Sequence, residues 1–142
     1  MSSKSISLTI FLIFIMNSCA TKKNIDIEKL YNTTWQLEYI TGPRIAFNAL
    51  YPDKKPKITF DKTSKKVTGT NSCNGYVADY YLTDNLISFG ESGPRTLMYC
   101  GEGENVFLEM MKKINKFRFN EEDKLILMLD DVAMMRFKKV VN

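Results

Sequence analysis

The chain of 142 residues contains no histidine. This absence excludes Ser-His-Asp and Cys-His catalysis, and any zinc site with histidine ligands. It also removes the side chain that exchanges protons most readily near neutral pH. Carboxylate chemistry stays open, but the two densest acidic groups, Glu121–Asp123 and Asp130–Asp131, fall in segments that we predict to be solvated turns. We therefore predict a protein that is not an enzyme and that uses no cofactor or metal.

The sequence also has neither a strong charge nor a long apolar run. Its formal net charge is +4, and the charges are interspersed, so the dense basic face that nucleic-acid binding requires is missing. The first apolar run, Ile6–Met16, has about eleven residues, whereas a membrane-spanning helix needs roughly 20. A basic start that includes Lys4 precedes this run. Together they have the form of a secretory signal.

A cysteine directly follows this apolar run, in the sequence Asn17-Ser18-Cys19-Ala20. The segment resembles a bacterial lipoprotein signal, in which a diacylglyceryl group joins the cysteine sulfur, and we expect cleavage after Ser18. Two or three acyl chains would anchor the protein firmly, because each buried methylene contributes about 0.8 kcal/mol. The alternatives are an ordinary secretory signal with an incidental cysteine, or an uncleaved anchor. By resemblance to Gram-negative sorting, the absence of aspartate after Cys19 favours the outer membrane, with the domain in the periplasm.

We divide the chain into three parts. Residues 1–18 are the expected signal peptide, residues 19–29 a polar tether, and residues 30–139 the folded domain. About ten extended tether residues would reach on the order of 35 Å from the membrane. The remainder is long enough for one domain with one core.

Only three cysteines are present. With Cys19 assigned to the lipid, Cys73 and Cys100 remain, and an even remainder in an exported chain favours one disulfide. Closing a loop of about 28 residues would stabilise the fold by roughly 3.5 kcal/mol. A free thiol pair for redox or metal chemistry is the alternative.

Alternation of apolar and polar residues dominates from Tyr31 onward and predicts half-buried antiparallel strands. Trp35, Leu37 and Tyr39 are expected on one face of the first strand, and Gly69 suggests a bulge or a close backbone approach. Leu125–Leu129 is apolar on both faces and is expected to be a strand covered on both sides. Further strands are expected around Ile58–Phe60, Val67–Asn71, Tyr76–Leu82, Leu86–Phe89, Thr96–Cys100, Phe117–Phe119 and Ala133–Lys138.

The period changes between Glu102 and Lys116, where apolar residues recur at three- and four-residue steps. This pattern predicts one amphipathic helix, with Glu104 and Glu109 on its polar side facing the lysines of its last turn. Its methionine and phenylalanine stripe is expected to be core. We predict a mostly β fold: a curved, nearly closed antiparallel sheet with one late helix covering an open end.

An ordered set of motifs resembles the META domain family of HslJ-like bacterial lipoproteins. The motifs are Trp35-Gln36-Leu37, Pro56–Phe60, Val67–Tyr76 with Cys73-Asn74-Gly75 inside it, Thr96-Leu97-Met98-Tyr99-Cys100, and Leu125–Leu127. Ser72 stands where glycine often precedes the first cysteine, and Tyr99 replaces a small residue. The resemblance implies an incompletely closed, lipocalin-like β-barrel in the cell envelope, pairs Cys73 with Cys100, and implies no catalytic activity.

Two functions are compatible with these features. The first is a non-enzymatic envelope lipoprotein that binds or stabilises another envelope component, linked by family resemblance to envelope or heat stress. The second is a carrier of a small apolar ligand, either a lipid or a drug-like molecule, because aromatic residues in a barrel could line a cavity. Aromatics that simply fill the barrel are the alternative to such a cavity.

Overall fold

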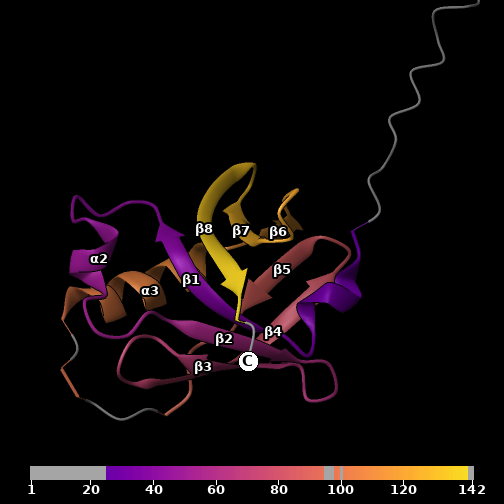
Figure 1. The fold of residues 1–142 in the computed structure, drawn as a ribbon. Coiled ribbons are helices and arrows are strands. Elements are labelled where there is room, and N and C mark those ends of the chain that lie inside the picture. The colour runs from indigo at the N-terminus through magenta and orange to yellow at the C-terminus, as the bar shows by residue number, and fades with distance from the viewer. Residues whose placement is uncertain (1–24, 95–97, 100, 141–142) are drawn as a thin grey trace, which may run out of the picture.

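The computed structural model describes residues 25–94, 98–99 and 101–140. Cys19, the predicted lipidation residue, the expected signal peptide (residues 1–18) and Cys100 lie outside the described residues. Within them, eight strands and three short or medium helices follow one another along the chain (Figure 1). The elements are η2 (Ile27–Leu30), β1 (Thr34–Ile40), α2 (Phe47–Leu50), β2 (Lys57–Asp61), β3 (Lys66–Thr70), β4 (Gly75–Thr83), β5 (Leu86–Phe89), α3 (Glu102–Lys113), β6 (Lys116–Phe119), β7 (Leu125–Leu129) and β8 (Val132–Lys139).

The strands form one ring-like antiparallel sheet. Each strand pairs with the next, and β8 returns to pair with β1, so the order around the ring follows the sequence. The weakest junction lies between β5 and β6, where the register contains the single pair Leu86↔Lys116. This arrangement confirms the prediction of a mostly β, incompletely closed barrel with one late amphipathic helix.

Strand β1 departs from simple alternation near its end. Trp35 and Leu37 point into the core as expected, but Tyr39 is 42% exposed and Ile40 is buried instead. The reason is a register shift against β8 between Leu37 and Tyr39, which moves the following side chains to the opposite face. The expectation that Tyr39 shares the inner face was therefore wrong.

Gly69 allows two strands to approach closely, as the sequence suggested. A Cβ atom added at this position would lie 1.8 Å from the carbonyl oxygen of Lys57 on β2. No other residue fits there without separating β2 from β3. The glycine thus fixes the pairing of Ile58 with position 69 at the end of the sheet that leads into the Cys73 loop.

The interior of the ring is filled by large side chains. Fully buried aromatic residues include Trp35, Phe60, Phe107, Phe117 and Phe137. Phe107 belongs to α3 and meets the ring of Tyr76 edge to face at 5.3 Å between centroids. The apolar stripe of α3 thus joins the barrel core, as its period predicted. The helix is shorter than the predicted Glu102–Lys116, since it ends at Lys113 and β6 begins at Lys116.

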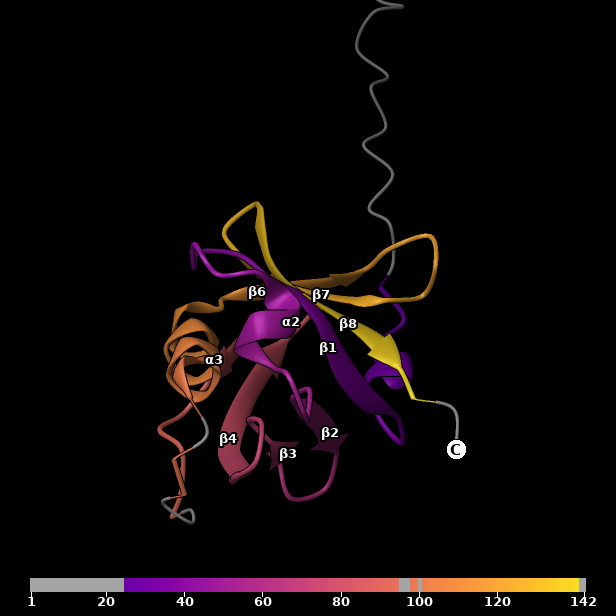
Figure 2. The same cartoon turned by 60° about the vertical axis from the view of Figure 1, so that its left-hand side comes forward.

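Helices α2 and α3 lie together at one end of the sheet, whereas η2 lies at the other (Figures 1 and 2). At the η2 end, Trp35 donates its indole N–H to the carbonyl of Leu30 at 3.1 Å, and Ile25 and Ile27 pack partly against the core. At the other end, the hydroxyl of Tyr51 donates to the carbonyl of Gly103 at 2.8 Å and ties α2 to α3. None of the described helices is long and apolar enough to cross a membrane.

Candidate functional site: a buried polar cluster beneath an end groove

The loop that carries Cys73 is held by a buried carboxylate. The side-chain amide of Asn71 donates to Oε1 of Glu104 at 3.0 Å, and the amide of Asn74 donates to Oε2 at 2.8 Å. Both asparagines are almost fully buried, and Glu104 is only 9% exposed. We call these three residues the buried polar cluster. Because a charged acceptor strengthens each bond, the cluster fixes the loop between β3 and β4 against the first turn of α3.

The position of Glu104 corrects a prediction from the sequence. Periodicity placed it on the polar side of the helix with Glu109, facing lysines. Instead it points inward to two carboxamides, whereas Glu109 is exposed and pairs with Lys112 at 3.5 Å. Helical spacing carried the signal, because Glu104 precedes Phe107 and Met111 by three and seven residues and therefore shares their buried face. What the spacing could not reveal is the pair of asparagines from the Cys73 loop that Glu104 binds.

The same cluster brings the two predicted cysteine segments together. Asn74 donates to the carbonyl of Met98 at 2.7 Å and accepts from the backbone N–H of Met98 at 3.2 Å. Cys73 precedes Asn74 directly, and Met98 stands two residues before Cys100. The described geometry therefore favours the predicted pairing, which stays a prediction because Cys100 lies outside the described residues.

Ser72 supports the loop at the cost of an uncommon backbone conformation. Its φ is +147°, a value that residues with a side chain rarely adopt. Its hydroxyl donates to the carbonyl of Lys54 at 3.3 Å, which links the Cys73 loop to the segment after α2. This geometry gives a physical reason why glycine often occupies the position before the first cysteine.

Two adjoining pockets open above the buried polar cluster, and together we call them the end groove. Both are lined by Pro52, Asp53, Lys54, Ser72 and Cys73. The polar pocket, of about 610 Å³, adds Gln36, Tyr51, Lys55, Lys57 and Thr70. The apolar pocket, of about 570 Å³, adds Ile45, Ala49, Leu50, Met98, Tyr99, Gly101 and Glu102.

The apolar pocket carries unusually exposed hydrophobic side chains. Tyr99 is 86% exposed, Met98 64% and Ile45 46%, although they come from two different loops. A cluster of exposed apolar side chains with a polar surround often marks a binding surface. In the adjoining polar pocket, Tyr51 is almost fully buried, and its burial raises the pKa of its phenol well above the usual range.

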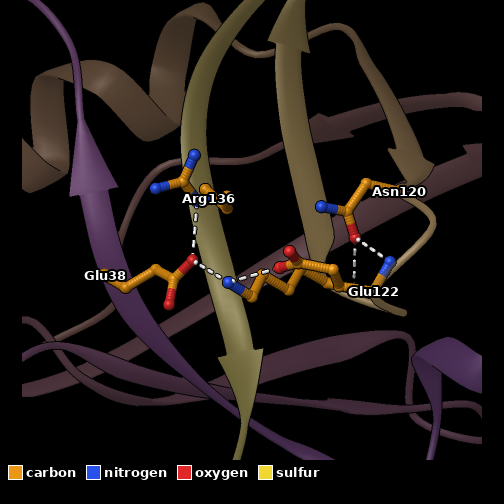
Figure 3. Close-up of polar contacts among 5 residues, drawn as sticks. Glu38, Asn120, Glu122 and Arg136 are labelled. Carbon is orange, nitrogen blue, oxygen red and sulfur yellow. Dashed lines mark hydrogen bonds and ion pairs between the residues drawn. The ribbon is translucent and has the colours of Figure 1, made fainter.

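A second polar cluster lies on the outer face of the ring, at the β1–β8–β7 junction (Figure 3). Glu38 accepts from Arg136 at 2.6 Å and from Lys124 at 3.0 Å, and Lys124 also pairs with Glu122. Burial tends to raise the pKa of Glu38, but the hydrogen bonds from Lys124 and Arg136 outweigh it and hold the pKa below its ordinary value. This network fastens strands and the 120–124 turn rather than forming a cleft.

The other acids that the sequence singled out also occupy paired turns. Asp123 accepts from Lys29 at 2.6 Å, Asp131 from Lys116 at 3.0 Å, and Asp130 from the Asn115 amide at 2.8 Å. Across the described ranges, no group of three Cys, Asp or Glu side chains is arranged to hold a metal ion. These carboxylates therefore serve turn geometry.

The fold belongs to the class of small, barrel-like β proteins: a ring of eight antiparallel strands with an amphipathic helix at one end. The family model for the META domain matches residues 28–141, so the chain belongs to the META domain family. A solved structure with the same fold is the NMR structure of a protein from Burkholderia xenovorans. It is 23% identical, with a TM-score of 0.60, over 80% of this chain and 85% of that one. No curated protein matches this chain in sequence.

Proposed function

We propose that this protein is a lipid-anchored binding module of the bacterial cell envelope without catalytic activity, and that the end groove is its binding surface. The exposed side chains of Met98, Tyr99 and Ile45, which line one pocket together with Ser72 and Cys73, carry this proposal. Asn74 of the Cys73 loop binds both the N–H and the carbonyl of Met98, so the backbone at Met98 is already held and less of it must be ordered on binding.

The proposed anchor is a lipid on Cys19, with the domain on the periplasmic side of the outer membrane. The described chain begins at the η2 end of the molecule, whereas α2 and α3, whose residues Leu50 and Glu102 line the end groove, lie at the opposite end (Figure 1). A tether that enters at η2 would leave the groove facing away from the anchoring membrane. This arrangement supports binding of another component of the cell envelope rather than of the anchoring membrane.

Binding in the groove is favoured over a ligand inside the barrel. The inward-facing side chains are large, and five aromatic residues of the interior are almost completely buried. Small barrels filled by side chains leave little room for a ligand. If the protein carries an apolar ligand, as the second function predicted from the sequence has it, the ligand would bind in the end groove and not inside the barrel.

Site-specific photo-crosslinking in cells tests the binding surface. A benzophenone side chain replaces Tyr99 in the full chain, and the matched control carries it at Tyr81, which is also highly exposed but lies on β4. We expect adducts at position 99 that are absent at position 81, with the adduct identified by mass spectrometry. Equal adduct patterns, or none at either position, would contradict the proposed surface.

Membrane fractionation tests the anchor separately. Cys19→Ala is expected to release the folded protein from membranes. Retention of this variant in the membrane fraction after an alkaline wash would rule out anchoring through a lipid on Cys19.

A further inference from the structure

The polar pocket of the end groove collects lysines that have no acidic partner. Lys54, Lys55 and Lys57 line it, and within the described residues none of them forms an ion pair, whereas Asp53 is the one acid of that pocket. Lys55 instead lies over the ring of Phe47, with its Nζ 5.3 Å from the ring centroid. Elsewhere on the surface, many lysines do pair with nearby carboxylates, as Lys66 does with Asp79.

Hydrogen-bonding side chains flank Lys57, and a further lysine lies two strands away. On the outer face of the sheet, Lys57 lies between Gln36 of β1 and Thr70 of β3, which both line the pocket. On the far side of Gln36, Lys138 of β8 is the next cross-strand neighbour. The polar pocket thus combines positive charge with amide and hydroxyl groups, which is the complement of a carboxylate or phosphate.

The apolar pocket adjoins the polar one through Lys54 and Cys73. Its exposed Met98, Tyr99 and Ile45 side chains offer apolar surface, and Glu102 is its additional acid. A ligand that spans both pockets must therefore be anionic at one end and apolar at the other. Each pocket also falls within the range of about 300–1,000 Å³ that is typical of small-molecule sites.

We propose that the end groove binds a single-chain anionic amphiphile, with its carboxylate or phosphate at Lys54 and Lys57 and its apolar chain along Met98, Tyr99 and Ile45. This inference rests on the proposed function and names its ligand class. Because α2 and α3, which contribute Leu50 and Glu102 to the groove, lie at the end of the molecule opposite η2, the ligand is taken up as a free molecule from the aqueous space and not from the anchoring membrane.

A titration followed by NMR tests the ligand class. The full chain carrying Cys19→Ala is labelled at its methionine methyl groups, so that Met98 reports on the apolar pocket. The probes are decanoate and decyl phosphate below their micelle concentrations, with neutral decyl maltoside and cationic decyltrimethylammonium as comparisons. A further sample contains phosphatidylglycerol vesicles, in which the anionic phosphate groups are part of a membrane surface.

Matched variants test the roles of the two pockets. Lys54→Gln with Lys57→Gln removes charge from the polar pocket, and Lys65→Gln with Lys113→Gln removes two exposed lysines elsewhere. We expect the anionic probes to shift the Met98 signal. The variant with Lys54→Gln and Lys57→Gln should bind these probes roughly five- to thirtyfold more weakly. The control pair should leave affinity unchanged. Tyr99→Ser should weaken the binding of both anionic probes.

The outcomes separate this inference from the proposed function. Equal binding of the neutral and anionic probes, or unchanged affinity in the Lys54 and Lys57 variant, would overturn the anionic class while leaving the groove a binding surface. Binding to vesicles without binding of the free probes would overturn the free-ligand source. If no probe shifts Met98 while crosslinking at position 99 still succeeds, the inference fails and the proposed function stands.

Discussion

Replacing Glu104 with alanine would test whether the buried polar cluster stabilises the fold. The change leaves the amide of Asn71 without its acceptor in a site that is fully shielded from water, whereas Asn74 keeps the carbonyl of Met98 as a second acceptor. A hydrogen bond to a charged group contributes about 1.5–3 kcal/mol, and an orphaned buried donor costs a further desolvation penalty. Including the small cavity, we expect a loss of about 3–4 kcal/mol.

Chemical and thermal unfolding would measure this loss. A reduction of that size lowers Tm by roughly 10–20 °C in a domain of this length. Glu104→Gln, which retains one acceptor oxygen, should lose about half as much. The control is Glu109→Ala on the same helix, whose exposed side chain should change stability by less than about 0.5 kcal/mol.

Amide hydrogen exchange adds a local readout. The N–H of Met98 donates to Asn74, so loosening the cluster should speed exchange at Met98 more than exchange in strands of the barrel core. If Glu104→Ala unfolds at nearly the same denaturant concentration as Glu109→Ala, the carboxylate does not hold the loop and the reasoning is refuted.

Three other perturbations have expected outcomes. Gly69→Ala should lower stability by at least about 2 kcal/mol in urea unfolding, because its Cβ would overlap the carbonyl of Lys57; an unchanged midpoint would contradict the close approach. Glu38→Gln should cost about 0.5–1 kcal/mol at neutral pH. Since the folded pKa of Glu38 is lowered, that difference should fade as unfolding is repeated from about pH 5 down to pH 3, and a constant difference would argue against ionic stabilisation. Cys73→Ala should lower stability by roughly 3.5 kcal/mol under oxidising conditions only, and an equal loss in reductant would argue against pairing with Cys100.

Local periodicity was enough to predict the barrel hairpins and the late helix. Ile58 and Phe60 alternate inward on β2, and Tyr76, Ala78 and Tyr80 do so on β4, because one face of each strand must be buried. Apolar residues recur every second position in a strand and every third or fourth in a helix whenever one face packs on a core, whatever the rest of the fold. The strand order then follows because each hairpin pairs neighbours in the sequence.

Features that depend on distant partners were not predictable in this way. The outward turn of Tyr39 depends on how β1 pairs with β8, almost a hundred residues later. The burial of Ile126 agrees with the expectation that Leu125–Leu129 is covered on both sides, but the residues that cover it could not be predicted. It lies outside the core cluster, on the face opposite Leu125 and Leu127. Its cross-strand neighbours are Arg118 and Arg136, so the doubly apolar strand is flanked on its outer face by long arginine side chains.

Two kinds of residue meet where the Cys73 loop contacts the segment of Met98 and Tyr99, and they respond differently to substitution. Asn71 and Asn74 are buried and bound to a carboxylate, so most replacements there remove hydrogen bonds that nothing else can supply. Met98 is held by two backbone hydrogen bonds to Asn74, while the side chains of Met98 and Tyr99 project from the surface. Substitutions at these two side chains can therefore change what the end groove binds without a large loss of stability. The Tyr99→Ser variant tests this distinction between stability and binding. Its free energy of unfolding should stay within about 0.5 kcal/mol of that of the parent, while its binding in the groove should weaken.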